Sequence, residues 1–133
     1  MARSAEKCQR VIEELIPLCK GNTPVFIQAD VADLDQVRTA CSQIASQFSR
    51  IDVLIHNAGA LLNTREVSQQ GIEQMIACHV VGPFLMTSLL ISQLEDGRVI
   101  TVSSGGMYSV GLPQAGSTQS LQMPESKYNG TKQ

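Results

Sequence analysis

Apolar residues recur along this chain in two ways, at helical spacing and as short unbroken runs. A helical pattern begins at Ser4 and stops at the Gly21-Asn22 pair, and a second begins near Asp33. In both, apolar side chains return every three or four residues, which places them on one face of a helix. We therefore expect two amphipathic helices, with Ser4 and Asp33 as their N-caps.

Residues 24–30 are a short, mainly apolar run that predicts a buried strand, and residues 51–55 and 98–103 have the character of strands buried on both faces of a parallel sheet. Residues 68–94 form a long helical region between the last two, interrupted at Gly82-Pro83, where proline removes a backbone donor and should kink the helix. Strands alternate with helices, which predicts an α/β fold with a doubly wound parallel sheet. We expect residues 1–133 to form one domain, in which residues 105–124 are an irregular loop.

Composition and charge argue against several classes of partner, location and site. The chain has a net charge of -2 and no basic cluster, so we expect no nucleic-acid partner. Its apolar runs fall short of the roughly 18 residues that a membrane span needs, so no transmembrane segment is expected. Residues 1–10 lack the apolar core of a secretory signal, which predicts a reducing, cytoplasmic compartment with free thiols. No metal site is expected, because no two cysteines have C-x-x-C spacing.

Polar residues gather where two of the expected strands end and again near the end of the sequence. The run at 51–55 is followed by His56, Asn57, Ala58 and Gly59. The run at 98–103 ends with Ser103 and Ser104. Tyr128 and Lys132 are four residues apart, so on a helix their side chains would share one face. An ammonium beside a phenol stabilises the phenolate, which would make Tyr128 usable as a general acid and base.

In this order, the Asn-Ala-Gly segment, the Ser-Ser pair and the Tyr-x-x-x-Lys spacing resemble the short-chain dehydrogenase/reductase family, over essentially the whole chain. Within the family, residues 63–66 and 98–107 resemble one member more than the others. The resemblance implies a Rossmann-like dinucleotide-binding domain and an oxidoreductase. The reaction it implies moves a hydride between NADP(H) and a carbonyl or alcohol substrate, with NAD as the alternative cofactor.

The resemblance assigns the catalytic roles to Ser104, Tyr128 and Lys132. Ser104 would hydrogen-bond the reacting oxygen, and Tyr128 would exchange the proton. Lys132 would activate Tyr128 and hold the nicotinamide ribose, so both residues are also expected in the cofactor site. Tyr108 is a competing phenol, but it lacks a lysine four residues on.

The remaining expected cofactor-binding residues are Arg3, Asp30, Val31, Asn57, Ala58 and Gly59. The family resemblance places the Asp30 carboxylate at the adenine, although a helix-capping role is the structural alternative. A guanidinium at Arg3 can pair with a 2′-phosphate, which favours NADP over NAD.

Departures from the family pattern bear on activity. His56 replaces the first Asn of the family's Asn-Asn-Ala-Gly segment, and His79 replaces a catalytic Asn. His79 could substitute through a ring nitrogen, could disable the proton relay, or could be a satisfied core histidine. The family's Gly-rich phosphate-binding turn and its C-terminal part have no counterpart in the sequence, so we expect an inactive fragment, incomplete at both ends.

Two other functions stay open. The chain could be a non-catalytic interaction protein, with the helix at 68–94 docking a full-length relative or a second copy. It could also resemble nucleotide-sugar epimerases and dehydratases, which share the Tyr-x-x-x-Lys arrangement. The Ser-Ser-Gly-Gly segment favours the dehydrogenase.

Overall fold

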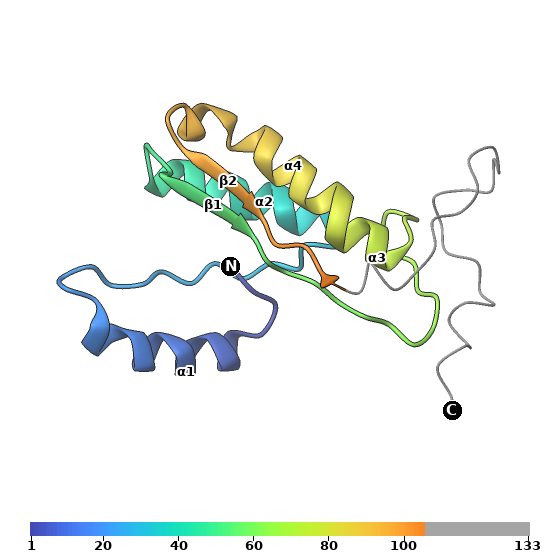
Figure 1. Ribbon diagram of the computed structural model, residues 1–133, viewed down its shortest axis with the longest axis horizontal. Helices are drawn as coiled ribbons and strands as arrows, with labels where there is room; N and C mark the ends of the chain where they lie inside the picture. The colour runs from blue at the N-terminus through green and yellow to red at the C-terminus, as the bar shows by residue number, and fades with distance from the viewer. Residues whose placement is uncertain (106–133) are drawn as a thin grey trace.

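The computed structural model describes residues 1–105, in which helices alternate with two parallel strands (Figure 1). The first half contains helix α1 (Ala5–Leu15), the 3-10 turn η1 (Ile16–Leu18), helix α2 (Leu34–Gln47) and strand β1 (Val53–His56). The second half contains α3 (Gln74–Ile76), the π turn η2 (Ala77–Val81), α4 (Gly82–Leu89), η3 (Ile91–Leu94) and strand β2 (Arg98–Thr101). β1 and β2 pair in parallel register, with Val53 opposite Arg98. The α/β fold class is thereby confirmed.

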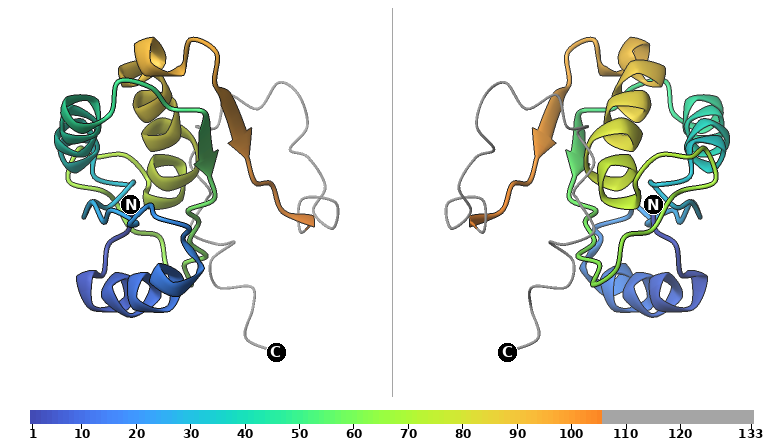
Figure 2. Two further views of the ribbon diagram at one scale, coloured as in Figure 1. Left: turned by 90° about the vertical axis from the view of Figure 1, so that its left-hand side faces the viewer. Right: turned by 90° about the vertical axis from the view of Figure 1, so that its right-hand side faces the viewer.

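The core lies between α2 and α4, which pack together on one side of the two strands (Figure 2). Val37 and Cys41 of α2 meet Met86 of α4 and Leu90, the C-cap residue of α4, and all four side chains are buried. The two residues of each pair are four positions apart, which places them on one face of a helix and explains this packing. By contrast, α1 buries none of its residues and lies apart from the α2–α4 pair (Figure 1).

Both predicted N-caps are confirmed. The Ser4 hydroxyl accepts a hydrogen bond from the Lys7 amide at 3.3 Å. The Asp33 carboxylate accepts from the amides of Asp35 and Gln36 at 3.0 and 3.3 Å. Each cap satisfies a backbone donor that the helix itself leaves unpaired. The hydrogen bond from the Gln36 amide is the largest influence holding the pKa of Asp33 below its usual value.

The prediction of a strand over residues 24–30 is wrong in detail. This run makes one parallel bridge, between Gln28 and Ala2, in which the Ala2 amide donates to the Ile27 carbonyl at 3.3 Å. Ile27 and Ala29 are buried, whereas Val25 is 56% exposed. Within residues 1–105 the run has no ladder of consecutive bridges, and a strand requires one.

The two strands are also more exposed than their apolar sequences indicate. Val53 and Ile55 in β1 are 47% and 57% exposed, and all four residues of β2 are exposed. Helices α2 and α4 lie on one side of these strands, and in Figure 2 no other described helix or strand covers the opposite side. The expectation of burial on both faces is therefore wrong for residues 1–105.

The long helical region begins at Gln74 rather than near residue 68, because Glu73 caps it by accepting from the Ile76 amide at 2.8 Å. It continues through Gly82-Pro83, where a kink was expected. Pro83 has no N–H to donate to the carbonyl four residues earlier, and the π turn Ala77–Val81 widens the helix just before it. The π turn thus accommodates Pro83, and the helical region continues past it into α4.

Candidate functional site

A cavity of about 510 Å³ lies between the N-terminal segment, the end of β1 and the start of α4. Its walls come from segments that are far apart in the sequence. The lining includes six of the residues expected to bind the cofactor: Arg3, Asp30, Val31, Asn57, Ala58 and Gly59. The structure therefore brings together what the sequence could only place at separate strand ends.

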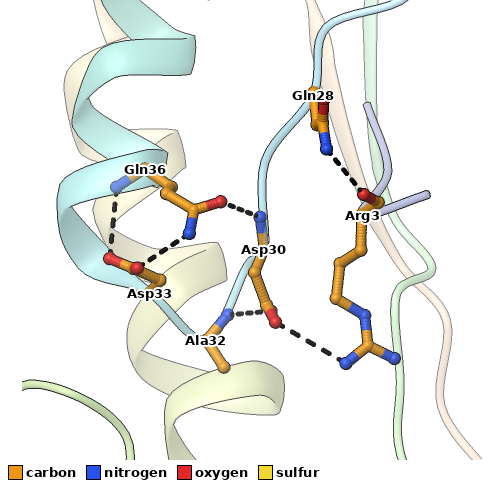
Figure 3. A network of polar contacts seen from close by, with 6 residues as sticks. All are labelled: Arg3, Gln28, Asp30, Ala32, Asp33 and Gln36. Atoms are coloured by element: carbon orange, nitrogen blue, oxygen red, sulfur yellow. Dashed lines mark hydrogen bonds and ion pairs between the residues drawn. The ribbon is translucent and has the colours of Figure 1, made fainter. Parts of the chain in front are cut away.

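The side chains of Arg3 and Asp30 point toward each other (Figure 3), and both residues line the cavity. Arg3 Nη1 lies 3.6 Å from Asp30 Oδ2, and the side chains are 66% and 27% exposed. The Gln28 side-chain amide donates to the Arg3 carbonyl at 3.0 Å, which ties the residue 3 backbone to the neighbouring run. The expected cation and the expected carboxylate are thus an ion pair in this structure.

A second set of hydrogen bonds in Figure 3 holds Asp30 in place. Its Oδ1 atom accepts from the Ala32 amide at 2.9 Å, and its own amide donates to Gln36 Oε1 at 2.9 Å. Gln36 in turn donates to Asp33 Oδ2 at 2.8 Å. Asp30 closes a local turn, and Asp33 caps α2, so the helix-capping alternative for Asp30 is wrong.

His79 supports the loop at residues 57–60. Its Nε2 atom accepts a hydrogen bond from the Ala60 amide at 3.1 Å. A Cβ atom at Gly59 would lie 3.2 Å from the same nitrogen, so loop and ring are in close contact. His79 is solvent-exposed, which excludes the core-histidine interpretation. The ring nitrogen does act as an acceptor.

His56 joins the end of β1 to α4. Its Nε2 atom lies 2.8 Å from Thr87 Oγ1, and that hydroxyl donates to the Pro83 carbonyl at 3.0 Å. Because the hydroxyl hydrogen is used by Pro83, Nε2 must carry the hydrogen of the bond to Thr87. Burial lowers the pKa of His56. The neutral ring is therefore the form that this position favours.

Cys78 contributes a thiol to the cavity wall from the π turn. Its side chain is buried, and burial raises the pKa of the thiol. The Asp30 carboxylate raises this pKa further, whereas the Arg3 guanidinium lowers it. The thiol is therefore held in its protonated form, as a small apolar group rather than a nucleophile.

Only one of the three expected catalytic residues, Ser104, lies within the described residues. Ser104 follows β2, is exposed, and is not one of the residues that line the cavity. Tyr128, Lys132 and the competing Tyr108 lie outside the described residues.

The sequence did not point to Thr87, Cys78 or Ala60. Thr87 interrupts an apolar helix, which is a usable signal that its hydroxyl has a polar partner. Cys78 gave no signal, because a cysteine in an apolar stretch is usually a packing residue. The Ala60 contact is made by a backbone amide, which side-chain identity does not reveal.

Comparison with known proteins identifies the chain's relatives. The family model for short chain dehydrogenases matches residues 1–115. The human protein "Dehydrogenase/reductase SDR family member 12" is 37% identical over 115 residues, which are 84% of this chain and 35% of that protein. It is the member that residues 63–66 and 98–107 resemble. "Oxidoreductase fscI" of Fusarium equiseti is 36% identical over 110 residues, 77% of this chain and 43% of that protein.

The fold also matches solved structures of dehydrogenases. A short chain dehydrogenase from Burkholderia cenocepacia J2315 in complex with NADP matches with a TM-score of 0.65 and 27% identity, covering 84% of this chain and 46% of that chain. An alcohol dehydrogenase from Thermococcus sibiricus, complexed with 5-hydroxy-NADP, shares the fold with a TM-score of 0.65 at 19% identity, over 96% of this chain and 51% of that chain. The chain thus spans about a third to a half of the proteins it matches. No helix within residues 1–105 is long and apolar enough to cross a membrane.

Proposed function

Because the chain belongs to the short-chain dehydrogenase family, we propose that it forms part of an oxidoreductase that transfers a hydride between NADP(H) and a carbonyl or alcohol. The observation that carries this proposal is the convergence of Arg3, Asp30, Val31 and residues 57–59 on one cavity. All six residues line the same cavity, although they come from three separate segments of the chain.

The cavity suits the adenosine end of the cofactor. Arg3 offers a guanidinium for a phosphate, and Asp30 offers a carboxylate for a hydroxyl or an amino group. Met86 and Leu54 provide apolar surface in the same cavity, against which a purine ring could pack. These features favour NADP, with NAD as the alternative.

The proposed chemistry assigns one role to each polar residue of the expected triad. Bound NADPH would supply the hydride to the carbonyl carbon. Tyr128 would give the proton that the carbonyl oxygen then takes, and Lys132 would stabilise the resulting phenolate and hold the ribose. Ser104 would hydrogen-bond the same oxygen. In alcohol oxidation Tyr128 would take the proton instead.

A second proposal, an interaction role, is favoured by the exposed apolar side chains on the helical region. Val80, Phe84 and Ile91 are 56%, 73% and 64% exposed. They lie in η2, α4 and η3, within the region where a docking helix was expected. A second copy of the chain, or a full-length relative, could cover them.

We also propose a single domain over residues 1–133 and a reducing, cytoplasmic location. All four cysteines are free thiols, and Cys41 and Cys78 are buried. Residues 1–133 alone are proposed to be inactive and to bind a whole dinucleotide weakly. Exposed apolar surface at Val25 and Val53 should also favour aggregation or dependence on a partner.

The test uses 2′,5′-ADP, the adenosine half of NADP, and NADPH itself. Titration of the ¹⁵N-labelled chain with 2′,5′-ADP should shift the amides of Asp30, Val31 and residues 57–59. Shifts confined to α1, or none at all, would refute the proposed cofactor site. Separately, micromolar or tighter NADPH binding by a monodisperse monomer would refute the weak-binding proposal.

A further inference from the structure

Arg3 and Asp30 form an ion pair in the lining of the cavity. Among the described residues that line it, these two carry the only side-chain charges at neutral pH, since burial favours the neutral form of His56. These two side-chain charges are opposite and lie 3.6 Å apart, so each offsets the other, while the amino terminus of Met1 also lines the cavity. A cavity that is meant to bind an additional phosphate would be expected to keep its cation available.

We propose that Asp30 limits the recognition of a 2′-phosphate by engaging Arg3, and so keeps the chain's selectivity for NADP over NAD small. This inference rests on the proposed function, because it concerns the adenosine end of the same cofactor. Asp30 thereby becomes a specificity-determining residue in addition to a contact for the adenine.

The geometry decides which partner moves when a phosphate approaches. Asp30 is fixed by the bond from the Ala32 amide to its Oδ1 and by the bond from its own amide to Gln36. The Arg3 side chain is 66% exposed and, across 3.6 Å, meets the carboxylate at the outer limit of an ion pair. Arg3 must therefore turn away from a carboxylate that stays where it is.

The two cofactors respond to that carboxylate in opposite ways. A 2′-phosphate brings more negative charge beside Asp30 and must compete with it for Arg3. A 2′-hydroxyl carries no charge and can donate a hydrogen bond to the carboxylate. Asp30 therefore weakens binding of the phosphorylated nucleotide and supports binding of the other.

The variant Asp30→Asn separates charge from structure. Asparagine keeps an oxygen that can accept from the Ala32 amide, but it no longer attracts Arg3. Asp33→Asn is the matched control: it removes the same charge, keeps a cap for α2, and belongs to the same network without touching Arg3. Asp30→Ser serves as a second variant with a short acceptor, and circular dichroism confirms the fold of each.

The probes are 2′,5′-ADP and 5′-AMP, which differ only in the 2′-phosphate, titrated into the full chain and followed by amide shifts at residues 57–59. Asp30→Asn should tighten 2′,5′-ADP binding by about two- to fivefold, the range for release of an exposed ion pair. Binding of 5′-AMP should stay the same or weaken. Asp33→Asn should leave the ratio of the two affinities unchanged. In an Arg3→Ala background, Asp30→Asn should give no gain.

Equal gains for both nucleotides, the same gain from Asp33→Asn, or a gain that persists without Arg3 would each overturn the inference. Its failure is distinguishable from failure of the proposed function. If neither nucleotide shifts residues 57–59 in any variant, the cofactor site itself is wrong. If both bind and Asp30→Asn does not change their ratio, only the role of Asp30 is wrong.

Discussion

His79 Nε2 accepts the Ala60 amide hydrogen at 3.1 Å, and this bond ties the π turn to the loop at residues 57–60. The same nitrogen would lie 3.2 Å from a Cβ atom added at Gly59. One ring therefore fixes the loop both by a hydrogen bond and by contact. The family residue at this position is an asparagine, whose side chain also carries an acceptor.

We predict that His79→Leu loosens the loop, because leucine offers no acceptor to the Ala60 amide, whereas His79→Asn keeps an acceptor and loosens the loop less. Loss of one hydrogen bond worth about 1 kcal/mol should speed amide exchange at Ala60 by about fivefold. Hydrogen exchange followed by NMR measures this directly, with the amides of β1 as an internal control. Unchanged protection of Ala60 in His79→Leu would show that the ring does not hold the loop.

Gly82 is predicted to tolerate no side chain. A Cβ atom there would lie 2.0 Å from the Val31 carbonyl oxygen and 3.0 Å from the Ala77 carbonyl oxygen. Gly82→Ala should therefore lower the free energy of unfolding by about 3 kcal/mol, the upper part of the overpacking range. Gly105→Ala is the matched control, because nothing lies within 4 Å of its added Cβ. Urea unfolding compares the two, and similar values for both would contradict the close approach of α4 to Val31.

His56 should make stability depend on pH with a definite sign. Its folded-state pKa is lowered from 6.5 by burial, so below that pH the unfolded chain binds more protons than the folded one. The free energy of unfolding should hold its full value above pH 6.5 and fall as the pH drops toward the folded-state pKa. Urea unfolding between pH 5 and 7.5, with His56→Asn as the reference, isolates this contribution. A folded-state pKa above 6.5 in an NMR titration would reverse the sign.

Arg3→Ala should weaken binding of the phosphorylated nucleotide selectively. A charge-assisted hydrogen bond is worth about 1.5 to 3 kcal/mol, and the lower figure applies here because Arg3 is exposed and shared with Asp30. Calorimetric or NMR titration should show the loss for 2′,5′-ADP, and for NADPH in an active longer form. Binding of 5′-AMP and NADH should change little. Equal losses for both classes of nucleotide would remove the case for NADP.

Tyr128→Phe tests the proposed proton transfer in an active polypeptide that contains this sequence. The substitution keeps the ring and deletes the hydroxyl, so carbonyl reduction should fall to near background while cofactor binding is largely retained. Tyr108→Phe is the matched control and should leave turnover unchanged. Retention of most activity in Tyr128→Phe would show that another group exchanges the proton.

Local interactions made several features of this protein predictable from the sequence. Ser4 and Asp33 cap their helices through bonds to amides two or three residues away, so residue order alone specifies them. The α2 stripe at Val37 and Cys41 follows from helical periodicity. The likeness of residues 57–59 and 104 to one family likewise depends on order and spacing, which are properties of the sequence.

Tertiary structure decided what depends on neighbours distant in the chain. The apolar run at Val53 and Ile55 looks suited to burial on both faces, but exposure depends on which elements cover it, and the described helices cover one side. Pro83 marks an irregularity, yet only the packing of Gly82 on Val31 and the adjoining π turn show how it is absorbed. Arg3 and Asp30 are 27 positions apart, and their pairing follows from the bridge between Ala2 and Gln28. The sequence could suggest that Arg3 and Asp30 each bind part of a ligand. Only the fold showed that the two side chains form an ion pair with each other.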